Sequence, residues 1–100
     1  MGENSLKALY LRNIRSLIDQ KKYYPRLSQK MGHTGEVVVS FTIDKSGKIE
    51  DMKVIKKCPF RKLNLSALKT LQKIASFNPI PQKLAMSSIN VQIPIIYNLR

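Results

Sequence analysis

The stretch that decides the fold runs from Ser88 to Leu99 and reads SINVQIPIIYNL. Apolar and polar residues alternate along it with a period of two, which is typical of a β-strand with one buried face. The apolar face carries Ile89, Val91, Ile93, Ile95, Tyr97 and Leu99. Pro94 lies in the middle of the run, and a residue without a backbone N–H is tolerated in a strand mainly at the edge of a sheet. The pattern therefore predicts a long strand at a sheet edge.

A β-hairpin is expected before this strand. From Glu36 the apolar residues again fall at every second position, and they share one face: Val37, Val39, Phe41 and Ile43. Residues 44–48, DKSGK, have the composition of a turn, and a second strand is expected from Ile49 to Lys56. The apolar residues of that strand divide between its faces, with Met52 and Val54 on one and Ile49 and Ile55 on the other. This change of parity predicts a β-bulge or burial on both faces.

Two segments before the hairpin have helical spacing. Between Ser5 and about Lys21, apolar residues recur at intervals of three and four, as on one face of a helix: Leu6, Leu9, Tyr10, Ile14, Leu17 and Ile18. Ser5 is expected to be the N-cap. Tyr24-Pro25 ends this pattern, because a residue before proline is pushed out of the α region. A short helix is expected from Pro25 to Met31.

A third helix is expected between the second strand and the last one. Residues 57–62 contain a proline and clustered charge, and we interpret them as a loop. Asn64 is the expected N-cap of a helix that runs to about Ser76. The buried stripe of this helix is expected to consist of Leu65, Leu68, Leu71, Ile74 and Ala75.

The order of these elements predicts an α+β fold, in which two N-terminal helices are followed by β-β-α-β. The hairpin strands are antiparallel and the third helix carries the chain back, so a wholly antiparallel three-stranded sheet must have the order 2-1-3. The helices are expected on one face of the sheet. The last strand then has an unpaired outer edge, which promotes aggregation unless something covers it. A partner peptide added as a strand would cover it, and the N-terminal segment or a second copy of the chain are the alternatives.

Composition limits the possible functions. One hundred residues fit one domain. We interpret residues 1–22 as an N-terminal tag remnant (Met1-Gly2) and an amphipathic helix, and residues 23–100 as the domain proper. Cys58 and His33 are the single cysteine and histidine and cannot supply a zinc site, so no metal or cofactor is expected. The six acidic residues form no catalytic pair, so the protein is not expected to be an enzyme and has no candidate catalytic residue.

The chain is strongly basic, with 18 Lys and Arg against 6 Asp and Glu and a net charge of +12. Such a charge favours anionic partners, among them nucleic acid, lipid headgroups and acidic cell-wall polymer. It is also spread along the chain, as on an ordinary solvated surface. Nucleic acid is not expected as the partner, because aromatic residues are few and the predicted strands lack a stacking platform. A basic module that binds nucleic acid or cell-wall polymer is kept as the alternative.

A set of spaced motifs resembles a known family. The matching positions are Tyr24-Pro25, Gly32, Gly35, the alternation from Val37 to Ile43, Gly47, Val54, Phe77-x-Pro79 and Val91-x-Ile93-Pro94-Ile95-x-Tyr97. In this order and spacing they resemble the C-terminal domain of TonB-type energy transducers. The resemblance covers about residues 23 to 99, and a TolA-like coupling domain is the related alternative.

The resemblance implies a periplasmic domain of an inner-membrane-anchored protein. Such a protein couples the proton-motive force to outer-membrane transporters, for example in iron–siderophore uptake, and works with inner-membrane motor proteins of the ExbB/ExbD type. The partner implied for this domain is the TonB box, a short peptide of the transporter that adds to the third strand. The implied peptide-binding residues are Gln20, Lys21, Tyr23, Tyr24 and Pro25 before the sheet, and Asn90, Val91, Gln92, Ile93, Ile95, Ile96, Tyr97 and Asn98 on the last strand.

Overall fold

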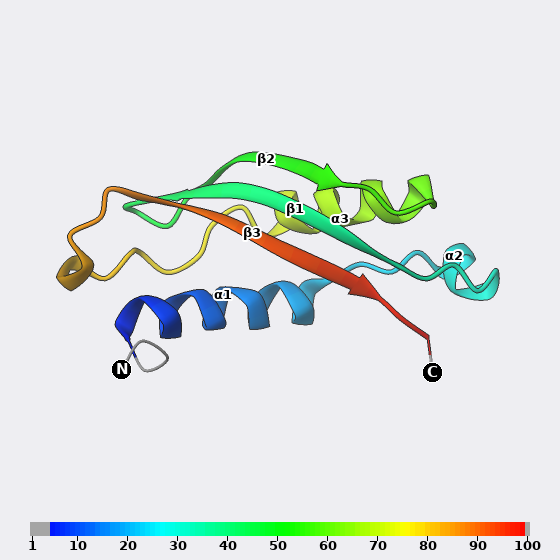
Figure 1. Ribbon diagram of the computed structural model, residues 1–100, viewed down its shortest axis with the longest axis horizontal. Coiled ribbons are helices and arrows are strands. Elements are labelled where there is room, and N and C mark those ends of the chain that lie inside the picture. Colours follow the sequence, from blue (N-terminus) through cyan, green and yellow to red (C-terminus); the bar gives the residue numbers. More distant parts are fainter. Residues whose placement is uncertain (1–4, 100) are drawn as a thin grey trace.

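The computed structural model describes residues 5–99 and has the predicted fold class (Figure 1). Its elements are α1 (Leu6–Lys21), α2 (Arg26–Lys30), β1 (Gly35–Asp44), β2 (Ile49–Lys56), α3 (Arg61–Ile74), the 3₁₀ helix η2 (Gln82–Leu84) and β3 (Ser88–Tyr97). The strands form one antiparallel sheet in the order β2-β1-β3, as predicted. The proposed Met1-Gly2 remnant lies outside the described residues.

One face of the sheet carries the hydrophobic core. The odd-numbered residues of β1 and β3 are buried on this face, from Val37 to Ile43 and from Ile89 to Tyr97. Both long helices pack against it: α3 contacts β1 and β2, whereas α1 contacts α3 and β3 (Figure 1). Each fully buried Val, Ile or Phe side chain contributes roughly 1.5–3 kcal/mol. The period-two pattern in the sequence therefore decides both the sheet and the face that the helices cover.

Helix α1 begins as predicted, with the Ala8 N–H donating to the Ser5 hydroxyl at 3.1 Å. Its buried line is narrower than the apolar pattern predicted. Tyr10, Ile14 and Ile18 are buried. Leu9, by contrast, is 47% exposed, because it is turned about 100° from Tyr10 around the helix axis. The Leu6 side chain, in the first turn, is also exposed.

For α3, the predicted N-cap was wrong, and the predicted buried stripe was right only in part. The helix begins at Arg61, and Asn64 is not its N-cap. The Asn64 amide instead accepts from the Cys58 N–H at 2.9 Å and donates to the Cys58 carbonyl at 3.0 Å, so it fixes the preceding loop. Of the predicted buried stripe, Leu71 is buried and Leu68 and Ile74 are half-buried, but Leu65 and Ala75 are exposed. The other buried residues of the helix are Leu63, Ser66, Ala67 and Thr70.

The hairpin confirms the predicted bulge. The pairing of β1 with β2 shifts twice, and each shift places an extra residue in β2. Asp51 in β2 has a positive φ of 53°, as a bulge residue often has. The turn is held by Asp44, whose carboxylate accepts from the Ser46 N–H, the Ser46 hydroxyl and the Lys48 N–H. The bond from the Ser46 hydroxyl and those from backbone amides lower the Asp44 pKa.

Candidate functional site: the free edge of β3

The β1–β3 ladder fixes which backbone groups of β3 point outward. The two strands pair without a register shift, from Gly35 with Tyr97 to Asp44 with Ser88. Asp44 donates its N–H to the Lys48 carbonyl on the hairpin side at 2.9 Å. Because backbone groups alternate in direction along a strand, the even-numbered residues of β1 face β2 and the odd-numbered ones face β3. The odd-numbered residues of β3 therefore bond to β1, and its even-numbered residues point their backbone groups away.

This geometry leaves a free edge, which we define as the outward backbone groups of Asn90, Gln92, Pro94 and Ile96. Within residues 5–99 no strand pairs with it. Asn90 and Gln92 offer both an N–H and a C=O. Pro94 offers only a C=O, and its outward position explains why proline is tolerated here without breaking the ladder to β1. The edge predicted from the sequence is therefore present, and its proline interrupts only the outer row of donors.

Lys22 closes one end of the free edge. Its ammonium group donates to the Ile96 carbonyl oxygen and lies 5.6 Å from the centre of the Tyr97 ring. The bond independently supports the outward direction of the Ile96 carbonyl. The edge that remains open thus extends from Asn90 to Pro94, with the Ile96 N–H beyond it.

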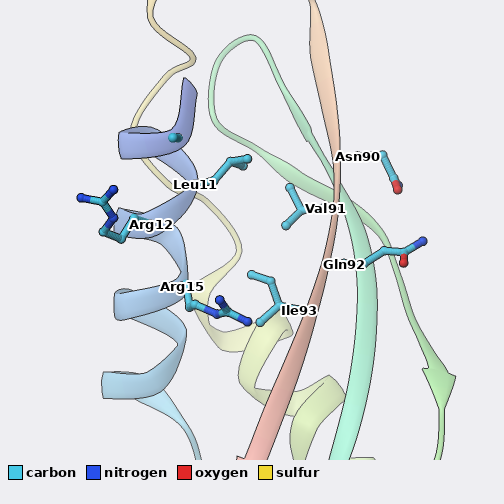
Figure 2. A pocket seen from close by; sticks show the side chains of 8 residues that line it. Leu11, Arg12, Arg15, Asn90, Val91, Gln92 and Ile93 are labelled. Atoms are coloured by element: carbon cyan, nitrogen blue, oxygen red, sulfur yellow. The ribbon is translucent and has the colours of Figure 1, made fainter. Parts of the chain in front are cut away.

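A hollow of about 460 Å³ lies between the free edge and α1 (Figure 2). We call it the edge groove. It is lined by Ala8, Leu11, Arg12 and Arg15 of α1 and by Asn90, Val91, Gln92 and Ile93 of β3. Figure 2 shows Leu11 directed toward Val91 and the Arg15 guanidinium directed toward Ile93, whereas Asn90 and Gln92 point to the opposite side of the sheet. If an extended chain paired with the free edge, these α1 side chains would lie against its face on the core side of the sheet.

The residues of β3 that are expected to bind a peptide fall into two groups by the direction of their backbone groups. Val91, Ile93, Ile95 and Tyr97 are buried and direct their backbone groups to β1, so they shape the groove or the core and supply no outward backbone bond. Asn90, Gln92 and Ile96 are exposed and direct their backbone groups outward. Asn98 is exposed and follows the strand.

Tyr24 packs against the far end of β3, and Pro25 follows it at the start of α2. The Tyr24 hydroxyl donates to the His33 carbonyl, and its ring packs edge-on against Tyr97 at 5.1 Å between centroids. Pro25 is half-buried and precedes the first residue of α2. Burial raises the pKa of the Tyr97 hydroxyl to about 12, and the nearby Thr70 hydroxyl offsets this only in part. Among the described residues, the Tyr97 hydroxyl makes no hydrogen bond of good geometry.

The structure does not bring the remaining expected residues to the edge groove. Tyr23 lies beside α3, where the ammonium groups of Lys69 and Lys73 approach its ring at 5.7 and 6.0 Å. Lys21 lines a separate hollow with Leu17, Lys73, Ile74 and Ser76. Gln20 is exposed near the end of α1. These three residues lie outside the lining of the edge groove.

Sequence reasoning missed the α1 side of the groove. Ala8, Leu11, Arg12 and Arg15 have the spacing i, i+3, i+4 and i+7, which places them on one helical face. That spacing was visible in the sequence, but the two arginines made the face look like an ordinary solvated surface. Lys22 was missed for the same reason.

None of the helices within residues 5–99 combines the length and the hydropathy that a membrane span requires. The same described residues contain no cluster of three or more His, Cys, Asp or Glu side chains that could hold a metal ion. The free edge offers a row of backbone hydrogen-bond donors and acceptors. Beside it, α1 lines the edge groove with the apolar side chains of Ala8 and Leu11 and the cationic side chains of Arg12 and Arg15.

Comparison with known proteins supports the resemblance. Residues 20–99 match the family described as Gram-negative bacterial TonB protein C-terminal. Protein TonB of Campylobacter coli is 37% identical over 90 residues, which are 90% of this chain and 37% of that protein. Protein TonB of Helicobacter pylori (strain ATCC 700392 / 26695) is 36% identical over 91 residues, which are 91% of this chain and 30% of that protein. The chain thus spans about a third of the length of these curated relatives.

The fold agrees with a solved structure of the same kind. The NMR solution structure of Helicobacter pylori TonB-CTD is 34% identical to this chain and superposes with a TM-score of 0.79. The match covers 98% of this chain and 88% of that one. A sequence match over residues 20–99 and a shared fold lead to the same conclusion: the chain belongs to the TonB C-terminal domain family.

Proposed function

We propose that this domain holds an extended peptide of an outer-membrane transporter, its TonB box, as a fourth strand on the free edge of β3. The observation that carries the proposal is the free edge itself, a regular row of outward backbone groups beside the edge groove. Strand addition uses main-chain hydrogen bonds for affinity and side-chain pockets for specificity. Both elements are available at this edge.

The expected affinity is modest. About five new backbone hydrogen bonds at roughly 0.5–1.5 kcal/mol each give roughly 3–7 kcal/mol before the cost of ordering the peptide. Binding of this strength is reversible. A coupling device that engages and releases a transporter in cycles needs such a contact.

We extend the proposal to the whole protein on the basis of family membership. It would be anchored in the inner membrane, present this domain in the periplasm, and receive energy from motor proteins of the ExbB/ExbD type. The domain would then transmit force or conformational change by binding, without catalysing a reaction. The cluster of Lys69 and Lys73 around Tyr23 is a candidate contact for anionic cell-wall polymer.

Nucleic-acid binding is less well supported. Single-strand binders stack bases on aromatic side chains. The outer face of β1 and β3 lacks aromatic residues and carries Glu36, Val38, Ser40, Thr42, Asn90, Gln92, Pro94 and Ile96.

An NMR titration tests the proposed function. We expect a synthetic peptide with the N-terminal sequence of a TonB-dependent transporter to shift the amide signals of Asn90, Gln92 and Ile96 together with those of Leu11 and Arg15. A peptide of the same composition with proline at alternate positions is the control, because it cannot complete the ladder. Shifts confined to the surroundings of Tyr23, or shifts with an oligonucleotide and none with the peptide, would reject strand addition.

A further inference from the structure

Helix α2 keeps its large apolar side chains in water and buries a small polar one. Leu27 is 50% exposed and Met31 is 63% exposed, whereas Ser28 is 0% exposed. Leu27 and Met31 are four residues apart and therefore project from the same side of the helix. Removing apolar surface from water is favourable, so two neighbouring exposed side chains of this size indicate a contact face.

Contacts on the buried side of α2 hold the exposed pair outward. The His33 N–H donates to the Ser28 carbonyl at 2.9 Å, and the Tyr24 hydroxyl donates to the His33 carbonyl. The His33 ring stacks on the Phe60 ring, with 4.1 Å between their centroids. These contacts fasten α2 to the loop before α3, so the exposed pair cannot turn inward without breaking them.

The helix lies at one end of the molecule, opposite the turn between β1 and β2 (Figure 1). The molecule measures 46 × 27 × 20 Å along its principal axes, so this end is the narrow end of an elongated body. Because Phe60 packs on His33, the segment around Phe60 belongs to the same end. We call residues 26–31 and 56–62 together the α2 tip.

The α2 tip is rich in cations. Residues 20–35 and 52–99 contain no Asp or Glu, and Glu36 is the acidic residue that follows the tip helix in the chain. Two further acidic residues, Glu50 and Asp51, belong to the hairpin end of the molecule. The tip carries these exposed basic side chains: Arg26, Lys30, Lys56, Lys57, Arg61 and Lys62.

We propose that the α2 tip docks on the surface of an anionic lipid bilayer, with Leu27 and Met31 inserted among the headgroups. Anionic headgroups complement the cations of the tip, and the boundary with the acyl chains accepts the two apolar side chains. A rigid protein partner would need a concave surface to match a protruding tip, whereas lipid headgroups can move aside around it. The tip shares no residue with the free edge or the edge groove, so the inference is independent of strand addition.

Co-sedimentation with vesicles measures the binding. The test vesicles contain two parts phosphatidylcholine and one part phosphatidylglycerol, and pure phosphatidylcholine vesicles are the neutral comparison. Arg26→Gln combined with Lys30→Gln removes two cations from the tip. Lys45→Gln combined with Lys48→Gln is the matched control, because it lowers the net charge equally at the hairpin end.

We expect the chain to bind the anionic vesicles and not the neutral ones. A basic side chain at an anionic surface strengthens binding about fivefold, so the tip variant should bind about 25-fold more weakly. The hairpin control should bind at most about twofold more weakly. Circular dichroism should show both variants folded, because all four lysine and arginine side chains are exposed.

A tryptophan reports insertion of the apolar pair. The chain has no tryptophan, so Leu27→Trp introduces a single reporter. Its emission should shift to shorter wavelength on anionic vesicles and should be quenched by lipids brominated on their acyl chains. Leu9→Trp is the control and should show neither effect, since Leu9 is 47% exposed on α1, outside the tip. Leu27→Ser combined with Met31→Ser should weaken vesicle binding about tenfold.

Three results would overturn the proposal. Equal losses for the two charge variants would show that net charge alone governs binding. Unshifted emission of Leu27→Trp on bound vesicles would show that the apolar pair does not insert. A shift of that emission with the transporter peptide, and none with vesicles, would make the tip a protein contact. The vesicle measurements contain no peptide, so strand addition stands or fails separately.

Discussion

Gln92 of β3 lies opposite Ser40 of β1, yet the Gln92 N–H points away from Ser40 and toward the edge groove. Its neighbour Val91 lies opposite Phe41 and directs its N–H into the ladder. Two adjacent residues thus differ in whether their backbone holds the sheet together or remains available to a partner.

This difference predicts opposite effects of proline at the two positions. Gln92→Pro removes an outward donor, so we expect the domain to stay folded and the transporter peptide to bind about two- to tenfold more weakly. Val91→Pro removes a ladder bond within the sheet and leaves a buried carbonyl of β1 without its donor, so it should destabilise the domain by about 1–3 kcal/mol. Urea unfolding followed by circular dichroism gives the stability, and fluorescence anisotropy gives the binding.

The control for this pair is Gln92→Ala, which keeps the N–H and should bind nearly as well as the original chain. Unfolding of Gln92→Pro would contradict the assigned direction of the backbone. Unchanged peptide affinity in a folded Gln92→Pro variant would exclude this segment of the edge from the site.

A second prediction concerns Gly47 in the hairpin turn. Gly47 has a φ of 97°, and a Cβ placed on it would lie 2.1 Å from the Phe77 carbonyl oxygen. The Phe77 N–H donates to the Gly47 carbonyl at 2.7 Å, so the two segments cannot separate without losing that bond. We expect Gly47→Ala to lower the free energy of unfolding by about 2–4 kcal/mol.

Gly32→Ala is the matched control for Gly47→Ala. Gly32 also has a positive φ, of 72°, but a Cβ there meets no atom within 4 Å. Its cost should be about 1 kcal/mol, from backbone strain alone. Equal losses of stability at the two positions would show that the close approach of Phe77 does not matter.

A third prediction concerns Tyr97. Its buried hydroxyl has no hydrogen bond of good geometry among the described residues, so we expect Tyr97→Phe to raise the free energy of unfolding by about 1 kcal/mol. The pKa of this hydroxyl is about 12 in the folded chain and about 10 when unfolded. The neutral tyrosine is therefore favoured by folding below pH 10, and this contribution is lost as the pH rises from 10 to 12.

Urea unfolding at pH 8 and at several values up to 11.5 tests this prediction. The difference in stability between Tyr97→Phe and the original chain should grow above pH 10, which separates Tyr97 from the lysines that both chains share. A constant difference over this range would mean that Tyr97 ionises as readily in the folded chain as in the unfolded one.

A fourth prediction concerns Lys22, which occupies the Ile96 carbonyl. Lys22→Met keeps the apolar stem but frees this acceptor, so an eight-residue strand-forming peptide should gain one hydrogen bond. Such a bond corresponds to about a two- to tenfold gain in affinity. Lys21→Met is the control, since Lys21 lines a different hollow and its removal changes the net charge equally. Weaker binding by both variants would indicate that general positive charge matters more than the closed end of the edge.

The sheet could be predicted from the sequence because its period-two alternation is long and unambiguous. The runs at Val37–Ile43 and Ile89–Tyr97 fixed the buried face, and Pro94 pointed to the edge. The phase of α3 could not be predicted in the same way. Ser66 and Thr70 are buried there, with the Thr70 hydroxyl bonded to the Ser66 carbonyl at 2.9 Å, while Leu65 is exposed. A prediction from apolarity alone would bury Leu65 and expose Ser66 and Thr70, which is the opposite of the observed burial.

The candidate site was only half visible in the sequence. The edge strand followed from the order of the elements, and the family resemblance drew attention to Tyr24 and Pro25. Arg15 gains its role from where α1 lies against β3, which is a tertiary relationship. The sequence of an amphipathic helix does not by itself predict which strand edge its charged residues will face.

The two edges of the sheet differ in a way that affects self-association. Strand β2 is bent by two bulges in its pairing with β1 and by the positive φ of Asp51. Strand β3 pairs with β1 without a shift, so its outer edge is regular from Asn90 to Pro94 apart from the missing N–H of Pro94. A sheet with two regular edges can recruit copies of itself without end. Of the two edges, only that of β3 is regular, so any association of copies through it would stop at a pair. A second copy would also have to compete with the peptide for the same row of backbone groups.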